Sequence, residues 1–328
     1  MRTGFGWRVA VAALILLATA APLYVIWDNG RVVVVEQEIT MERLPDPFDG
    51  FTILHITDLH SKRFGPQQAR LLRRIDALEY DAVAITGDMI NYRDRCLEPF
   101  YELLAGIEGT VPILFARGNT DPRDYDPFTG EVRAFGEELQ RRGVTLLNRP
   151  FGVTREGATL WFTAWHDVAT LEHILERLQE ELIRTSPEGE RRTALENEVA
   201  YLEGLQTFWA EVDPEDLKIV LTHYPLSRQY RERVRQPPDP HYDLFIAGHY
   251  HGGQIRIPLL GATYVPDATG SRMGFFPDQG EVSGLMGPPH AQQVVSRGLG
   301  ASDVLPLLGF RLFNPPEINL LRLRVPHR

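Results

Sequence analysis

The sequence has a single cysteine and no excess of positive charge, and each of these absences excludes a class of protein. Cys96 alone cannot form an internal disulfide or supply the thiolates of a structural zinc site. Asp and Glu outnumber Lys and Arg by 44 to 34, which gives a net charge of −10. Non-specific binding to a nucleic-acid polymer relies on clustered Lys and Arg, so we expect no such partner. Small phosphorylated molecules stay compatible with an acidic chain, because metal ions can neutralise their phosphates.

One apolar run, residues 9–27, is long enough to cross a bilayer as a helix. Arg2 and Arg8 precede the run and Asp28 follows it, which favours an N-terminus inside the cell and a body outside the cytoplasm. We therefore predict a single-pass membrane anchor over residues 1–28 and one folded domain over residues 29–328. The segment Ala18-Thr19-Ala20 leaves a cleaved signal peptide, and hence a secreted body, as the alternative.

Five short polar clusters each follow an apolar run further along the chain. They are Asp58-Leu59-His60, Gly87-Asp88, Gly118-Asn119, His223 and Gly248-His249-Tyr250-His251. Together they supply two Asp, one Asn and four His, which is a full ligand set for two metal ions. Oxygen and imidazole ligands suit Zn, Mn or Fe better than a metal that prefers thiolates. The Asp-x-His spacing fits the end of a strand, where residues i and i+2 point to the same side.

Strands and helices alternate in the predicted order. Apolar strands are expected at residues 51–57, 82–86, 113–116, 217–222 and 244–247, and helices at residues 66–78 and 97–107. This alternation predicts an α/β fold. Every cluster lies just beyond the carboxyl end of a predicted strand, which is where sites in open α/β sheets usually form.

The segment of residues 170–211 has a different pattern, with two amphipathic helical stripes on either side of the turn at residues 185–189. We predict an inserted helical hairpin whose stripes pack on each other and on the core. A lid and a partner-binding surface are the alternatives. The aromatic pair Phe208-Trp209 is compatible with a place in the core or against a membrane.

The order D-x-H, G-D, G-N, H, G-H-x-H resembles the calcineurin-like metallophosphoesterase superfamily. Residues 53–61, 248–255, 296–300 and 315–318 are similar to its membrane-anchored bacterial branch, which includes phosphodiesterases and enzymes that cleave UDP-2,3-diacylglucosamine. The resemblance covers about residues 31–325. It implies a two-sheet sandwich flanked by helices.

The same resemblance implies two sets of metal ligands that share Asp88. One set is Asp58, His60, Asp88 and His251, and the other is Asp88, Asn119, His223 and His249. In such a centre two divalent ions (Mn, Zn or Fe) share a hydroxide that attacks phosphorus, with Asp88 in a catalytic role as the bridge.

The chain departs from the family at Thr120. The family usually has His at this position, where it is held to protonate the leaving group, whereas this chain reads Gly118-Asn119-Thr120-Asp121. Threonine is a poor proton donor near neutral pH. The enzyme then acts on good leaving groups, or another residue supplies the proton, for which His166 is our candidate, or the site serves mainly to bind.

We therefore predict a metal-dependent hydrolase of phosphodiester or pyrophosphate bonds, acting on a phosphorylated small molecule or a lipid-linked substrate. The alternatives are a catalytically weak, metal-containing binding protein and a nucleotide phosphomonoesterase. The apolar loop at residues 273–277 is expected either to contact lipid or to pack as an ordinary hydrophobic loop.

Overall fold

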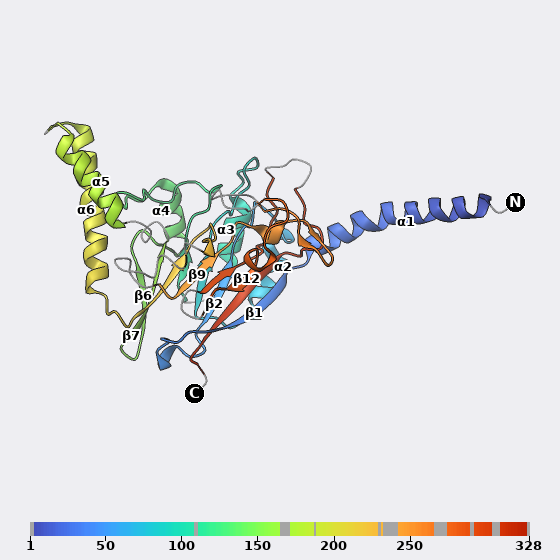
Figure 1. Cartoon of the computed structure of the whole chain (residues 1–328), viewed down its shortest axis with the longest axis horizontal. Coiled ribbons are helices and arrows are strands. Elements are labelled where there is room, and N and C mark those ends of the chain that lie inside the picture. The colour runs from blue at the N-terminus through green and yellow to red at the C-terminus, as the bar shows by residue number, and fades with distance from the viewer. Residues whose placement is uncertain are drawn as a thin grey trace.

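Two six-stranded sheets form the centre of the computed structural model (Figure 1). The structure describes residues 3–107, 111–164, 171–186, 188–228, 231, 242–265, 274–288, 292–303 and 309–326. The first sheet has the order β1-β14-β2-β3-β4-β5 and the second the order β12-β13-β9-β8-β7-β6. Both are mixed, and β2, β3, β4 and β5 run parallel, as do β13, β9, β8 and β7.

The strands of the first sheet are β1 (Val33–Thr40), β2 (Thr52–Ile56), β3 (Ala82–Ile85), β4 (Ile113–Phe115), β5 (Val144–Leu146) and β14 (Glu317–Arg324). Those of the second are β6 (Phe151–Arg155), β7 (Ala158–Ala164), β8 (Leu217–Leu221), β9 (Leu244–Ala247), β12 (Gly284–Met286) and β13 (Gln292–Val295). A small antiparallel pair, β10 (Arg256–Ile257) and β11 (Gly261–Ala262), stands apart from both sheets. The five strands predicted from the apolar runs are all present, within one or two residues of the expected ends.

Side chains that alternate along each strand divide the core into two layers. Ile53 of β2 and Ala84 of β3 belong to the cluster between the sheets, which also contains Phe162 of β7 and Ile246 of β9. Leu54 and its neighbours on the other face pack under the helices. Because both faces of the first sheet are covered at its centre, strands β3 and β4 are apolar and buried throughout, as expected for buried strands.

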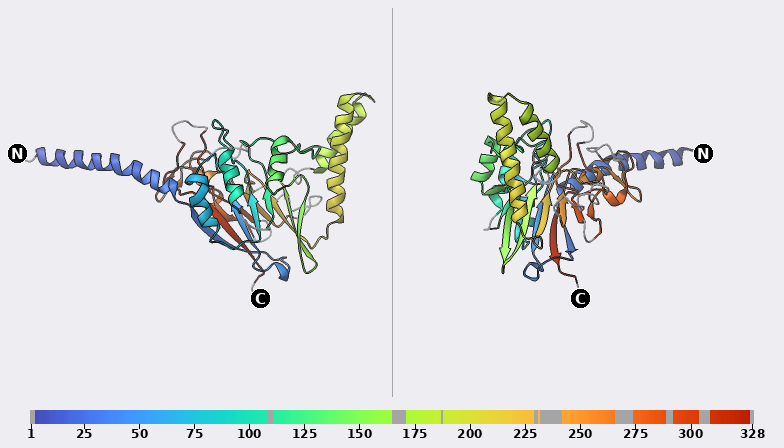
Figure 2. Two further views of the ribbon diagram at one scale, coloured as in Figure 1. Left: turned by 180° about the vertical axis from the view of Figure 1, so that it is seen from behind. Right: turned by 60° about the vertical axis from the view of Figure 1, so that its left-hand side comes forward.

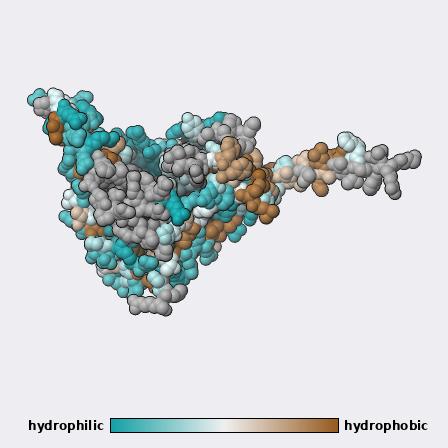
Figure 3. All heavy atoms as spheres, viewed as in Figure 1, coloured by the Kyte–Doolittle hydropathy of each residue, from teal (hydrophilic) through white to brown (hydrophobic). Residues whose placement is uncertain are grey.

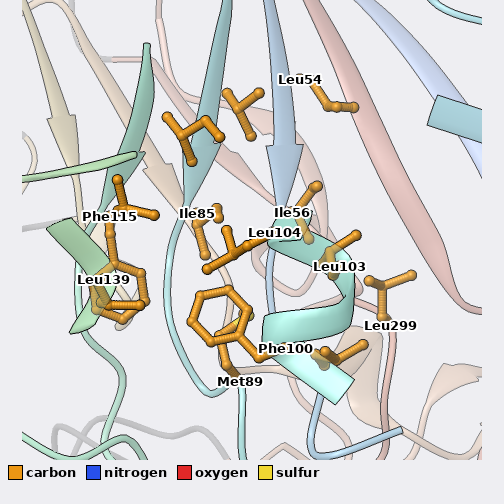
Figure 4. Packing of buried hydrophobic residues seen from close by; sticks show 14 of the residues in the cluster. Leu54, Ile56, Ile85, Met89, Phe100, Leu103, Leu104, Phe115, Leu139 and Leu299 are labelled. Atoms are coloured by element: carbon orange, nitrogen blue, oxygen red, sulfur yellow. The ribbon is translucent and has the colours of Figure 1, made fainter. Parts of the chain in front are cut away.

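Three helices cover the outer face of the first sheet: α2 (Ala69–Ile75), α3 (Glu98–Gly106) and α4 (Ala134–Arg141). Figure 4 shows Phe100 and Leu103 of α3 over Ile56 and Ile85 of the sheet. The predicted fold, a two-sheet α/β sandwich with flanking helices, is confirmed.

Helix α1 (Thr3–Gly30) projects from one side of the body (Figures 1 and 2). Within it, Val11–Gly30 is apolar and long enough to cross a membrane. Its apolar side chains lie outside the body, for example those of Leu14 and Leu16. The helix ends inside the body, where Asp28 is buried and pairs with Arg31 at 2.8 Å.

The predicted helical hairpin is formed by α5 (Leu171–Arg184) and α6 (Glu190–Glu211), on the opposite side of the body from α1 (Figures 1 and 2). Leu175 and Leu178 pack against Leu195, Val199 and Leu202, so the two stripes do face each other. Phe208 and Trp209 are part of the fold, because the Phe208 ring contacts Trp161 of β7 at 5.0 Å and Trp209 is buried.

Candidate metal centre

The candidate ligands meet where the carboxyl ends of five strands converge. Asp58 and His60 follow β2, Asp88 follows β3 and Asn119 follows β4, while His223 follows β8 and the His249–His251 segment follows β9. Backbone bonds join the loops: the amide of Asp58 donates to the Gly87 carbonyl at 2.9 Å, and that of His60 donates to the Asp88 carbonyl at 3.0 Å. The two sheets thus bring together residues up to 193 positions apart in the chain, from Asp58 to His251.

Six of the seven side chains form two buried groups. One contains Asp58, His60 and His251, and the other contains Asp88, His223 and His249; within each group the ligand atoms lie within 4.8 Å of one another. Asp88 lies between the groups, since its Oδ2 is 3.3 Å from Nε2 of His223 and 3.7 Å from Nε2 of His60. The side chain of Asn119 lies at the same edge but is exposed.

Five of these residues have a left-handed backbone, with φ between 50° and 70°: Asp58, His60, Asp88, His249 and His251. This conformation is uncommon for residues other than glycine, and strain of this kind concentrates at functional sites. The surrounding hydrogen bonds therefore hold the loops in a shape that aims the side chains inward at a cost in stability.

Two glycines leave room for these side chains. A Cβ on Gly118 would overlap Oδ1 of Asp88, and a Cβ on Gly248 would overlap Oδ2 of Asp58. At these positions any side chain would displace a candidate ligand.

Burial and neighbouring charges set the protonation of the site. Burial lowers the pKa of His60 and His251, and it lowers that of His249 to about 3. These rings are therefore neutral at pH 7 and keep a lone pair for coordination. Burial also raises the pKa of Asp58 to about 7. It disfavours charge on His223 as well, but the Asp88 carboxylate outweighs this effect and raises the His223 pKa to about 9.

The chemistry of the donors fits divalent ions. Among the described residues, Nε2 of His60 and Nε2 of His249 are buried without a hydrogen-bond partner. Buried polar atoms are rarely left unpaired, and a metal ion in the first group would satisfy Nε2 of His60. In the second group, Nδ1 of His249 faces Nε2 of His223 at 3.1 Å. The Nδ1–H of His223 donates to the Thr86 carbonyl at 2.8 Å, which leaves its Nε2 facing Asp88. Such a bond on the far nitrogen is typical of a metal-binding histidine.

Thr120 is buried, and its hydroxyl donates to the Ile90 carbonyl at 2.6 Å. Its backbone N–H donates to Oδ1 of Asp88 at 2.9 Å. The residue therefore orients Asp88, and its hydroxyl proton is engaged by the backbone. His166 lies outside the described residues.

Asp121 was not singled out by the sequence patterns, yet its buried carboxylate anchors the two loops that follow β3 and β4 and carry the candidate ligands Asp88 and Asn119. It accepts the backbone N–H groups of Asp88 at 2.7 Å, Met89 at 2.8 Å and Gly118 at 2.9 Å. The only signal in the sequence is its place one residue after Thr120.

Replacing Asp121 with asparagine should weaken metal binding about 10–100-fold, because an amide cannot accept all three bonds and supports around metal ligands have effects of this size. The measurement is a titration of divalent metal into the variant. Asp126→Asn is the matched control, since Asp126 also accepts backbone N–H groups, from Phe128 and Thr129, in a loop outside the site. Equal metal affinity for the two variants would contradict the role of Asp121.

A second support, Arg311, also gave no signal in the sequence. Its guanidinium is fully buried and donates to the carbonyls of His251 at 3.1 Å, Arg297 at 2.6 Å and Gly300 at 2.5 Å. Residues 296–300 in turn lie against Asp58, since the Leu299 amide donates to the Thr57 carbonyl at 3.1 Å. Arg297 pairs with Glu317 of β14. Residues 296–300 and 315–318, the two late stretches that resemble the membrane-anchored branch of the family, thus together support the group of Asp58, His60 and His251.

Comparison with known proteins identifies the family to which this arrangement belongs. The model of the calcineurin-like phosphoesterase family matches residues 51–253, a range that includes all seven candidate ligands. The chain belongs to the calcineurin-like phosphoesterase family. The resemblance read from the motifs is confirmed, and membership supports a metal-dependent phosphoesterase.

Two curated relatives are similar along most of the chain. A phosphodiesterase of Escherichia coli, YaeI, is 27% identical over 289 residues, which cover 83% of this chain and 82% of the relative. A zebrafish (Danio rerio) transmembrane protein with a metallophosphoesterase domain is 27% identical over 259 residues, 77% of this chain. That match spans about half, 52%, of the zebrafish protein's length.

Solved structures with detectable similarity include two hydrolases. The phosphopantetheinyl hydrolase of Mycobacterium tuberculosis matches 62% of this chain and 83% of its own at 15% identity, with a TM-score of 0.34. A dimetal phosphatase from Danio rerio matches 76% of this chain and 88% of its own at 14% identity, also with a TM-score of 0.34.

Proposed function

We propose that this phosphoesterase holds two divalent ions and hydrolyses a phosphodiester or pyrophosphate bond. The observation that carries the proposal is the pair of buried ligand groups joined by Asp88, which lies within 3.7 Å of a histidine from each group. Mn, Zn and Fe suit these ligands.

The candidate ligands divide between the two proposed ions. One ion would be held by Asp58, His60 and His251 and the other by His223, His249 and Asn119, with Asp88 available to both. When bound, the ions supply Lewis acidity toward the phosphoryl oxygens and make water a usable nucleophile near neutral pH. Asp121 and Thr120 keep the Asp88 loop in place through their contacts with its backbone and carboxylate.

The state of Thr120 favours substrates with good leaving groups. Its hydroxyl proton is donated to the Ile90 carbonyl, so it is not available to a leaving oxygen. General acid catalysis is worth about 10²–10⁴-fold, and a site without it depends on the leaving group's own acidity. His166 stays our candidate for an alternative donor.

We further propose that α1 anchors the enzyme in the membrane with the catalytic domain outside the cytoplasm. Helix length and composition support the anchor, and the flanking charges of Arg2, Arg8 and Asp28 support the orientation. The substrate is then a phosphorylated small molecule or a lipid-linked phosphoester.

The test is hydrolysis of bis-p-nitrophenyl phosphate beside p-nitrophenyl phosphate, by the full chain in detergent with Mn²⁺ or with chelator. We expect metal-dependent turnover that is faster on the diester. Preference for the monoester would favour a phosphomonoesterase instead. A folded protein that binds metal but turns over neither compound would favour the binding protein.

A further inference from the structure

Six large apolar side chains are exposed on the body close to the C-terminal end of α1, where the helix meets the body. We call this set the apolar collar: Ile257, Leu259, Leu260, Phe275, Phe276 and Phe313. Leu259 is fully exposed and Phe275 is 80% exposed. A contiguous exposed patch formed by several large apolar side chains marks a contact with a partner or a membrane.

The collar is one hydrogen-bonded unit. Ile257, Leu259 and Leu260 lie on the β10–β11 hairpin, and the amide of Phe276 donates to the Thr263 carbonyl just beyond it at 2.8 Å. The Phe275 ring contacts Tyr264 at 5.2 Å. On the other side, the amide of Arg256 donates to the Leu312 carbonyl at 3.0 Å, which fixes Phe313 beside β10.

The collar is also continuous with α1. The Phe313 ring lies 5.2 Å from Tyr24, and Tyr24 lies 5.9 Å from Trp27 on the next turn of the helix. Figure 3 shows hydrophobic surface gathered where α1 leaves the body. A helix that crosses a bilayer would therefore bring the collar to the same bilayer surface.

Positive charge near the C-terminal end of α1 would complement an anionic membrane surface. A cleft of about 560 Å³ is lined by Trp27 of α1 and by four arginines: Arg31, Arg70, Arg73 and Arg74. The last three are exposed, and among the described residues they form no ion pair. Arginines beside a membrane helix are attracted to anionic headgroups, and here they gather on a protein whose net charge is −10.

We propose that the apolar collar inserts into the lipid bilayer beside α1, so that the body rests on the membrane instead of hanging from a single helix. The proposal rests on the anchor role of α1 and goes beyond it. It has a consequence for the site, because only five residues separate the candidate ligand His251 from Ile257. The loop that carries His251 would lie next to the lipid–water boundary, within reach of a phosphoester on a lipid headgroup.

The test uses spin labels on the full chain, with Cys96→Ser as background, in vesicles of phosphatidylcholine and phosphatidylglycerol. Single cysteines replace Leu259, Phe275, Leu16 of α1 and Ile183. Ile183 is the matched control, because it is an apolar side chain, 84% exposed, on the hairpin at the far side of the body. Collisions with oxygen report immersion in lipid, and collisions with a water-soluble nickel chelate report exposure to water.

We expect labels at 259 and 275 to favour oxygen, as the label at 16 does, while the label at 183 favours nickel. Labels at 259 and 275 that behave like 183, with 16 immersed, would overturn the collar and leave the anchor intact. Labels at 259 and 275 hidden from both reagents would indicate a protein contact and also overturn it. A label at 16 that favours nickel would refute the anchor, and the collar with it.

Discussion

Asp88→Asn should lower kcat/KM for bis-p-nitrophenyl phosphate by about 10³-fold or more, because it removes the carboxylate whose Oδ2 lies 3.7 Å from His60 of one ligand group and 3.3 Å from His223 of the other. An amide has a single oxygen and no charge, so it cannot serve two cations as a carboxylate does. Metal ions stabilise charge in the transition state by several kcal/mol, and each 1.36 kcal/mol is a factor of ten.

The variant should stay folded, since an amide oxygen at this position still accepts the Thr120 N–H that now reaches Oδ1 at 2.9 Å. Bound metal, measured by elemental analysis, should fall together with activity. Asp76→Asn is the control, the same chemical change on an exposed carboxylate at the end of α2. Full activity in the Asp88 variant would rule out the shared bridge.

Arg311→Met should destabilise the fold by about 3–5 kcal/mol, the range for breaking a buried charged network. The guanidinium donates to three carbonyls in two loops, those of His251, Arg297 and Gly300, and a fourth bond reaches the Asn314 carbonyl in a third loop at 2.8 Å. Methionine fills a similar volume but removes all four donated bonds, and in the part of the chain that the structure describes only the His251 carbonyl keeps a second donor, the Asn314 side-chain amide at 2.7 Å. Urea unfolding of the full chain in detergent measures the loss.

Two further variants separate the causes of that loss. Arg311→Lys keeps a charge but lacks the planar fork, so we expect a smaller but definite loss of stability. Arg141→Met changes an exposed arginine on α4 that pairs with Glu138, and it should cost less than about 1 kcal/mol. A stability of Arg311→Met equal to that of Arg141→Met would show that the buried network is dispensable.

The positions of the candidate ligands could be predicted from the sequence because each of the five clusters follows its own strand. Asp58, Asp88 and His223 lie just after the buried strands β2, β3 and β8. Neighbouring parallel strands end at the same edge of a sheet, which brings these residues together. The alternation of strands and helices and the packing of the α5–α6 stripes could be predicted because apolar periodicity is local, whereas the two-sheet sandwich was implied only by the family resemblance.

The supports of the site could not be predicted in this way. Arg311 contacts the His251 carbonyl 60 residues away, and nothing in its neighbourhood distinguishes it from an exposed arginine. In the sequence Asp121 resembles an ordinary turn residue. Its role is visible only in the folded structure, where the Asp88 loop lies against it. The left-handed backbone of five ligands likewise depends on the approach of distant loops, because none of these residues prefers that conformation by itself.

The end of α1 matters for any shortened form of the enzyme. Asn29 receives the backbone N–H of Arg311 at 2.9 Å and donates its own amide to the Arg311 carbonyl at 2.7 Å. A soluble fragment that starts after Gly30 would lose both bonds, and with them a brace on the residue that holds the His251 loop. Proteolytic release near Ala18-Thr19-Ala20 would keep Asn29 in place. The point of cleavage therefore decides whether the released enzyme retains an intact site or a loosened one.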